Sequence, residues 1–131
     1  MSDKPSELLV ITKAKDLCSY VMTVTQKSPK QFRFTFVSRM QNLCLSVIEN
    51  LYRANDVFAL PGDQKAFSRR LNYQHEAATD LRILCYFSEL AMTQQCIPPK
   101  QYEQISVYAP KPTSAWVRKL YCDRLKGIDI F

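Results

Sequence analysis

Two long stretches of the chain carry apolar residues at the spacing of one helix face. In residues 29–55 the main apolar stripe recurs every three or four positions, at Phe36, Met40, Leu43, Val47 and Leu51. Residues 65–94 keep the same period, and neither stretch contains a glycine or a proline after its first residue. This pattern is typical of a long amphipathic α-helix. The chain is therefore predicted to fold around two long helices.

Two shorter helices are predicted on either side of the long pair. Residues 12–27 place Leu17, Val21 and Val24 on one helical face, which predicts the first helix. The fourth helix is predicted over residues 100–126. Pro110 and Pro112 should interrupt it near residues 110–113, because a proline inside a helix costs about 3 kcal/mol.

Local signals mark where the predicted helices start and stop. Ser28 is predicted to cap the second helix with its hydroxyl group, with Pro29 at the first helical position and Gln31 three residues after the cap. Residues 56–64 contain Leu60-Pro61-Gly62-Asp63 and are predicted to form a loop. The run Cys96-Ile97-Pro98-Pro99 should end the third helix.

The predicted helices should form a single domain. The chain has 131 residues and a mass of 15.2 kDa, which suits one core and is short for two ordinary domains. Its 47% hydrophobic and 23% charged residues are near the average for globular proteins, which argues against a wholly disordered chain. The predicted fold class is all-α: an up-down-up-down four-helix bundle with an interrupted fourth helix, in a single domain covering residues 1–131.

Neither a membrane span nor a disulfide framework is predicted. No apolar run approaches the roughly 18 to 20 residues needed to span a bilayer, and the charged N-terminal residues do not resemble a signal peptide. The five cysteines are odd in number and never form a Cys-x-x-Cys pair, which argues against a zinc site as well as disulfides. We therefore expect a cytoplasmic protein with reduced, mostly buried thiols.

The sequence offers no catalytic constellation. The chain has only 2 glycines and lacks the motifs of phosphate-binding and dinucleotide-binding loops. His75-Glu76 begins like the helix of a zinc protease, but Thr79 occupies the second ligand position, and Asn72 stands where a di-iron bundle would have glutamate. Glu76 and Asp80 lie one turn apart, which is more often a solvated face or half of an inter-helix salt bridge than a catalytic pair. We therefore predict no enzymatic activity, no catalytic residues, no bound metal and no cofactor.

The net charge of +6 comes from two basic segments. Residues 27–48 contain 4 basic and no acidic residues, and residues 104–131 contain 5 basic and 2 acidic ones. Such segments favour a polyanionic partner such as RNA or DNA, and general solubility is the alternative explanation. From charge alone, the candidate nucleic-acid-binding residues are Lys30, Arg69, Arg70, Arg118 and Lys119. The two arginines at the start of the third helix would gain from the partial positive charge of a helix N-terminus.

The apolar arcs of the two long helices are wider than one bundle core requires. The second strip on residues 29–55 consists of Phe34, Val37, Cys44, Leu45 and Ile48. The corresponding strip on residues 65–94 consists of Ile83, Phe87 and Leu90. A helix that is apolar over so wide an arc needs a second partner. Self-association is the preferred explanation, and the alternative is that these strips face the broken fourth helix and the 56–64 loop within one subunit.

Several polar marks on the helices resemble those of a known family. They are Lys13-Ala14-x-Asp16-Leu17, Pro29-x-x-x-Arg33-Phe34-x-x-x-x-Arg39-x-x-Asn42-Leu43, Glu49-Asn50-Leu51-x-x-Ala54, Leu81-Arg82-x-Leu84 and Gln101-Tyr102-Glu103. The chain in this respect resembles, over most of residues 8–120, a four-helix-bundle family. That family includes the accessory variability determinant (Avd) proteins of diversity-generating retroelements and the proteins encoded within 23S rRNA intervening sequences.

The resemblance implies a set of partners. The retroelement accessory proteins assemble as barrel-shaped homopentamers and bind the retroelement reverse transcriptase and nucleic acid, supporting mutagenic copying of template RNA into cDNA. Carried over by position, Arg33, Arg39 and Arg82 match basic marks of the family. The partners implied are thus a reverse transcriptase, template RNA or cDNA, and further copies of this chain.

The sequence departs from the family in its fourth helix, and three classes of function are compatible with it. The family's fourth helix normally runs unbroken, so the prolines at 110 and 112 should reshape the surface around the basic residues that follow them. The preferred function is a noncatalytic accessory subunit of a retroelement reverse transcriptase. The alternatives are an RNA-binding bundle of the 23S rRNA intervening-sequence type, and a self-associating structural bundle with no nucleic-acid role.

Overall fold

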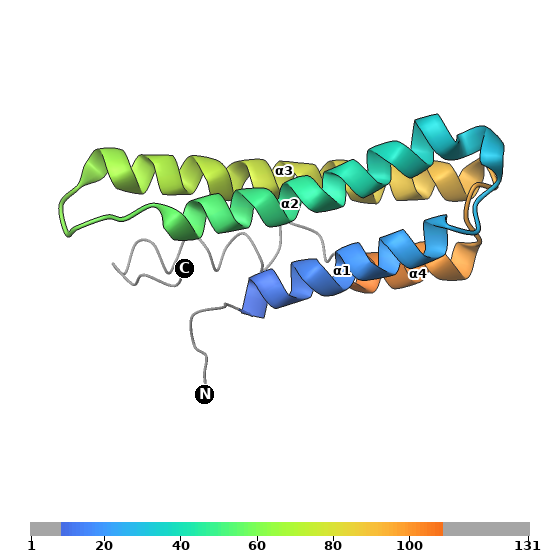
Figure 1. Ribbon diagram of the computed structural model, residues 1–131, viewed down its shortest axis with the longest axis horizontal. Coiled ribbons are helices and arrows are strands. Elements are labelled where there is room, and N and C mark those ends of the chain that lie inside the picture. Colours follow the sequence, from blue (N-terminus) through green and yellow to red (C-terminus); the bar gives the residue numbers. More distant parts are fainter. Residues whose placement is uncertain (1–8, 109–131) are drawn as a thin grey trace.

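The computed structural model describes residues 9–108, which form four α-helices and two short helical segments (Figure 1). The α-helices are α1 (Leu9–Thr25), α2 (Ser38–Asp56), α3 (Gln64–Thr93) and α4 (Pro99–Tyr108). A 3-10 turn, η1 (Lys30–Phe32), and a π-helical turn, η2 (Arg33–Val37), lead into α2. The predicted all-α class and the four helices are confirmed.

The four helices run alternately up and down. Each helix packs against the next one in the chain, and α4 also packs against α1. The long helices α2 and α3 lie antiparallel beside each other, and the shorter α1 and α4 lie along one side of this pair (Figure 1). Residues 26–29 and 94–98 make the connections at one end, here named the two-loop end, and the α2–α3 connection lies at the other.

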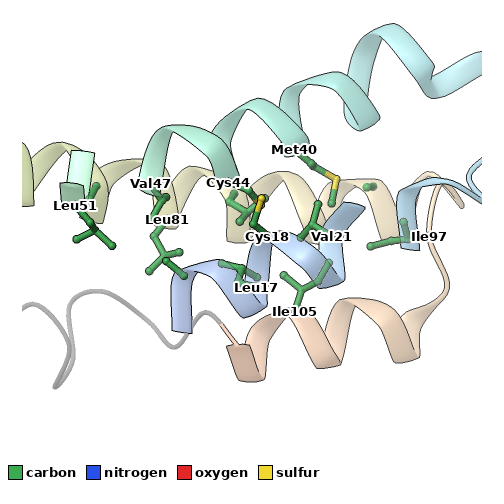
Figure 2. Close-up of a cluster of buried hydrophobic side chains, with 14 of the residues drawn as sticks. Leu17, Cys18, Val21, Met40, Cys44, Val47, Leu51, Leu81, Ile97 and Ile105 are labelled. Carbon is green, nitrogen blue, oxygen red and sulfur yellow. The ribbon is translucent and has the colours of Figure 1, made fainter. Parts of the chain in front are cut away.

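The core forms where the apolar stripes of the helices meet (Figure 2). Leu17 and Val21 of α1 face Met40 and Val47 of α2, while Ile105 closes the cluster from α4. Burying a side chain of this size contributes about 1.5–3 kcal/mol relative to leaving it exposed. The main stripe predicted for the second helix is thus the one that fills the core at Met40, Val47 and Leu51, with Phe36 and Leu43 half-buried beside it.

The second long helix starts differently from the sequence prediction. Pro29 is extended, with ψ of 144°, and no side chain caps η1, so the predicted Ser28 cap is wrong. The Ser28 N–H instead bonds to the Thr25 carbonyl at 3.2 Å, which places this residue in the turn that follows α1. The Gln41 amide then joins the two helices by donating to the Thr25 hydroxyl at 2.9 Å.

The loop between α2 and α3 follows from its sequence. Gly62 has a φ of 87°, and the Asp63 N–H bonds to the Leu60 carbonyl at 3.0 Å. Proline followed by glycine is typical of a tight turn that needs a left-handed third residue. The Asp63 carboxylate then caps α3 by accepting from the Ala66 N–H at 3.1 Å.

The end of α3 is a Schellman motif without glycine. The Cys96 N–H reaches the Ala91 carbonyl at 2.7 Å, and the Gln95 N–H reaches the Met92 carbonyl at 3.0 Å. Gln95 holds the left-handed position that glycine usually takes, with a φ of 66°. Pro99 then starts α4, since proline is well suited to the first helical position, and the Pro98 carbonyl accepts from the Tyr102 N–H at 3.2 Å.

Part of the predicted fourth helix falls outside residues 9–108, including the interruption predicted at Pro110 and Pro112. Within those described residues, no helix combines the length and the apolar character needed to cross a membrane.

Candidate nucleic-acid interface

Four basic side chains near the start of the second long helix are all exposed. They are Lys27, Lys30, Arg33 and Arg39, and are named here the basic end. The segment that carries them runs from the α1–η1 connection through η2 into the first turn of α2, at the two-loop end (Figure 1). Glu89, one turn before the end of α3, and Glu103 in α4 are the acidic residues of those helices nearest to this end. The exposed Lys100 is the second residue of α4. The balance of charge at the two-loop end is therefore positive.

The basic end borders two separate hollows. The first, named the polar hollow, has a volume of about 410 Å³ and is lined by Thr25, Gln26, Ser28, Pro29, Lys30, Arg33, Val37 and Gln41. Two cations and two amide side chains face this space, which suits an anionic oxygen as a ligand. Arg39 does not line it and belongs to the second hollow. The structure thus divides the three predicted residues between two faces of the same end.

The second hollow, named the aromatic hollow, has a volume of about 280 Å³ and is lined by Phe34, Thr35, Phe36, Arg39 and Phe87. The Arg39 guanidinium carbon lies 5.3 Å from the centroid of the Phe87 ring, a cation–π contact between α2 and α3. Phe34 is the second residue of η2 and is 84% exposed. π-helical turns are rare and occur frequently at functional sites.

Sequence reasoning missed the aromatic hollow. It placed Phe34 and Phe87 on two apolar strips, but it gave no reason to bring these rings together with a cation. The alternation Phe32-Arg33-Phe34-Thr35-Phe36 is a signal that could have drawn notice, since three aromatic residues in five positions do not fit one helical stripe.

The adjacent arginines at the start of α3 have different environments. Arg69 is exposed, as the prediction requires. Arg70 is only 4% exposed, and its Nη2 donates to the Val57 carbonyl at 2.5 Å. Its guanidinium carbon also lies 5.8 Å from the centroid of the Phe67 ring. Arg70 therefore holds the α2–α3 connection and is not part of the candidate interface.

The other predicted basic residues are not brought together with the basic end. Arg69 lies at the opposite end of the bundle, where α3 begins (Figure 1). Arg82 is exposed near the middle of α3. Arg118 and Lys119 lie outside the described residues. The candidate interface therefore consists of Lys30, Arg33 and Arg39, with Lys27 beside them.

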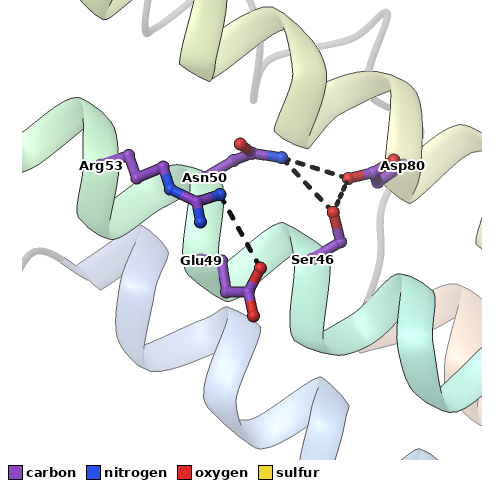
Figure 3. A network of polar contacts seen from close by, with 5 residues as sticks. All are labelled: Ser46, Glu49, Asn50, Arg53 and Asp80. Carbon is purple, nitrogen blue, oxygen red and sulfur yellow. Dashed lines mark hydrogen bonds and ion pairs between the residues drawn. The ribbon is translucent and has the colours of Figure 1, made fainter.

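A network of hydrogen bonds to the Asp80 carboxylate joins α2 to α3 (Figure 3). The Ser46 hydroxyl donates to Asp80 Oδ2 at 2.5 Å, and the Asn50 amide donates to the same oxygen at 3.3 Å. Asp80, noted in the sequence as half of a possible carboxylate pair, thus serves as a link between helices. Nearby, Arg53 and Glu49 form an exposed ion pair of 3.8 Å, which contributes little because water screens it.

The described cysteines are free thiols in apolar surroundings. Cys18, Cys44 and Cys96 are buried and Cys85 is half-buried. Desolvation by burial raises the pKa of all four thiols, most strongly that of Cys44. Within residues 9–108, no group of three or more histidine, cysteine or acidic side chains is arranged to hold a metal ion.

The residues of the second apolar strips are partly buried and partly exposed within one subunit. Cys44 enters the core, and Val37, Ile48 and Phe87 pack half-buried against it. Leu45, however, is 43% exposed. Contacts inside the subunit explain part of the second strip, and the exposed remainder is available to a partner.

A scan against models of protein families finds no match, and searches of curated proteins and of solved structures find none either. The resemblance to the retroelement accessory family therefore rests on the sequence motifs. The structure adds to it an all-α, four-helix architecture.

Proposed function

We propose that this protein is a noncatalytic accessory subunit of a diversity-generating retroelement, which acts in the cytoplasm. In this role it binds the retroelement reverse transcriptase and RNA, and so supports mutagenic cDNA synthesis. The observation that carries the proposal is the basic end, where four exposed cations lie within one short segment. The resemblance of the sequence motifs to those of the accessory family is the reason for proposing a polymerase partner and a retroelement.

The basic end has the properties expected of a phosphate-binding surface. The sequence contains no acidic residue between Asp16 and Glu49, so neighbours in the chain do not neutralise these cations. Each phosphate that such a surface neutralises releases a counterion, which strengthens binding at low salt. Two of the cations also border a hollow with polar walls, which gives a phosphate hydrogen-bond donors as well as charge.

The proposal includes self-association, with a pentamer as the form that the family resemblance implies. The exposed side chains of Leu45 in α2 and of Tyr86 in α3, 43% and 59% exposed, support it, because apolar surface of this kind is commonly covered in assemblies. The same side chains favour the alternative of a structural bundle with no nucleic-acid role. An RNA-binding bundle of the 23S rRNA intervening-sequence type would use the basic end without any polymerase.

The decisive experiment is a tagged pull-down from the native host, with mass spectrometry of the co-purifying proteins before and after ribonuclease treatment. A reverse transcriptase that co-purifies with an excess of this chain supports the accessory role. Recovery of ribosomal components alone would favour the intervening-sequence type. Recovery of this chain alone, without RNA, would favour the structural bundle.

A binding assay then tests the surface. The triple variant Lys30→Ala/Arg33→Ala/Arg39→Ala should weaken RNA binding and reduce the slope of log affinity against log salt by up to about 2, at roughly 0.7 per lost contact with a single strand. The matched control, Lys13→Ala/Arg53→Ala/Lys65→Ala, removes the same charge from exposed positions elsewhere. Equal losses in both variants would show that net charge, and not the basic end, controls binding.

A further inference from the structure

The aromatic hollow contains an apolar side chain that nothing in the described subunit covers. Phe34 is 84% exposed, although it lines the same hollow as two half-buried rings, Phe36 and Phe87. Removing an aromatic ring of this kind from water is energetically favourable. The Arg39 guanidinium stands over the Phe87 ring at the same place. The hollow therefore offers a flat apolar surface edged by a positive charge.

The size of the hollow restricts its occupant. Its volume of about 280 Å³ lies just below the range for small-molecule pockets, which begins at roughly 300 Å³. A docked helix would need anchor positions across two or more turns of a groove. The aromatic hollow instead lies around the single turn of η2 and one ring of α3. It is suited to one planar ring system.

Cations close to Phe34 in the chain suggest the chemistry of that ring system. Lys30 and Arg33 border the polar hollow within four residues of Phe34, and both are exposed. A flat aromatic group with anionic groups attached on either side is the repeating unit of a nucleic acid. Bases in a duplex are already stacked and paired, so only an unpaired base presents a free face to Phe34.

We propose that the aromatic hollow stacks an unpaired base of single-stranded RNA on Phe34, while Lys30 and Arg33 bind the adjoining phosphates. This inference rests on the proposed RNA-binding function and specifies the form of RNA that is bound. Arg39 holds the Phe87 wall of the hollow and adds a cation beside the base. The protein accordingly prefers single strands to duplexes, and base identity matters little because every base has a stacking face.

The test is a titration of the full-length protein by fluorescence anisotropy with three RNA ligands. They are a labelled oligonucleotide of about a dozen nucleotides without self-complementarity, the same strand annealed to its complement, and the same strand with abasic central positions. Wild-type protein should bind the first most tightly. Phe34→Ala should weaken that binding about 10-fold at fixed salt, with an unchanged salt slope because no charge is removed. Phe34→Trp should retain wild-type affinity.

A matched control comes from the opposite end of the bundle. Phe58 lies in the α2–α3 connection and is 77% exposed, so Phe58→Ala removes an equally exposed ring. It should leave RNA affinity unchanged. Because both rings are exposed, both variants should fold, and a thermal melt by circular dichroism checks this.

The outcomes separate this inference from the function on which it rests. If Phe34→Ala binds single-stranded RNA like wild type while the basic-end triple variant does not, the stacking site is rejected and the RNA-binding surface stands. Equal affinity of the wild-type protein for single-stranded, duplex and abasic RNA also rejects the stacking site. No binding of any RNA rejects both. A changed sedimentation mass in Phe34→Ala, with unchanged RNA affinity, would assign the hollow to a contact between copies of the chain and overturn the inference.

Discussion

Replacing Arg70 with alanine should destabilise the fold and leave RNA binding unchanged. Arg70 is 4% exposed and donates to the Val57 carbonyl at 2.5 Å. Val57 directly follows the last residue of α2, so this bond fixes the chain between α2 and α3. The side chain also rests against the Phe67 ring. A residue used in this way acts on stability rather than on a ligand.

The expected loss can be worked out from these contacts. A hydrogen bond from a charged donor contributes about 1.5–3 kcal/mol, and its removal leaves a buried carbonyl without that donor. Loss of the packed aliphatic stem adds to this. We therefore expect the free energy of unfolding to fall by about 3 kcal/mol, which for a domain of this size lowers Tm by roughly 10 °C.

Urea unfolding followed by far-UV circular dichroism measures the loss, with RNA affinity measured on the same samples under conditions where the variant is folded. Arg69→Ala is the matched control, because it removes the same charge from the exposed neighbouring position. Arg69→Ala should leave stability within about 0.5 kcal/mol of wild type. If instead Arg70→Ala were as stable as Arg69→Ala and lost RNA affinity, the structural assignment of Arg70 would be refuted.

Three further predictions concern stability and thiol chemistry. Asp80→Ala should lower the free energy of unfolding by about 1–3 kcal/mol in a urea titration, because the Asn50 amide, 4% exposed, loses its carboxylate acceptor. A loss below about 0.5 kcal/mol, the usual effect of a surface substitution, would contradict this. Gln95→Gly should raise stability by about 1 kcal/mol, since glycine adopts the φ of 66° without strain, whereas Gln95→Ala should show no gain in the same assay. Burial raises the pKa of Cys44 above the ordinary value of 9.0, so its thiol stays protonated as the pH rises to that value. Peptide mapping after alkylation at pH 8–9 should therefore find Cys85 modified before Cys44 in the folded protein and both modified in urea; rapid native modification of Cys44 would show that it is not shielded.

Much of the architecture could be predicted because it depends on neighbours in the chain. The stripe through Met40, Val47 and Leu51 follows from helical periodicity, and burial of one face follows from the stripe. The turn at Pro61-Gly62 needs only the conformational preferences of those two residues. The predicted Ser28 cap is wrong, although its motif is also local, because Ser28 is used in the turn that follows α1.

The candidate site could be predicted only in part. Lys30, Arg33 and Arg39 stand out in the sequence because no acidic residue accompanies them, and the structure leaves all three exposed. The aromatic hollow depends on Phe87, more than fifty positions after Phe34, and on the π-helical turn that directs Phe34 outward. No local pattern specifies either feature.

The sequence by itself determined that this chain forms amphipathic helices, where most of them begin and end, and where its positive charge is concentrated. These properties follow from local spacing, turn residues and composition. Only the tertiary structure decided that Arg70 is buried while Arg69 is exposed, since the difference depends on a carbonyl thirteen residues away. Helix packing likewise decided that Asp80 accepts hydrogen bonds from Ser46 and Asn50. A carboxylate on a helix surface stays in water unless the neighbouring helix places hydrogen-bond donors against it.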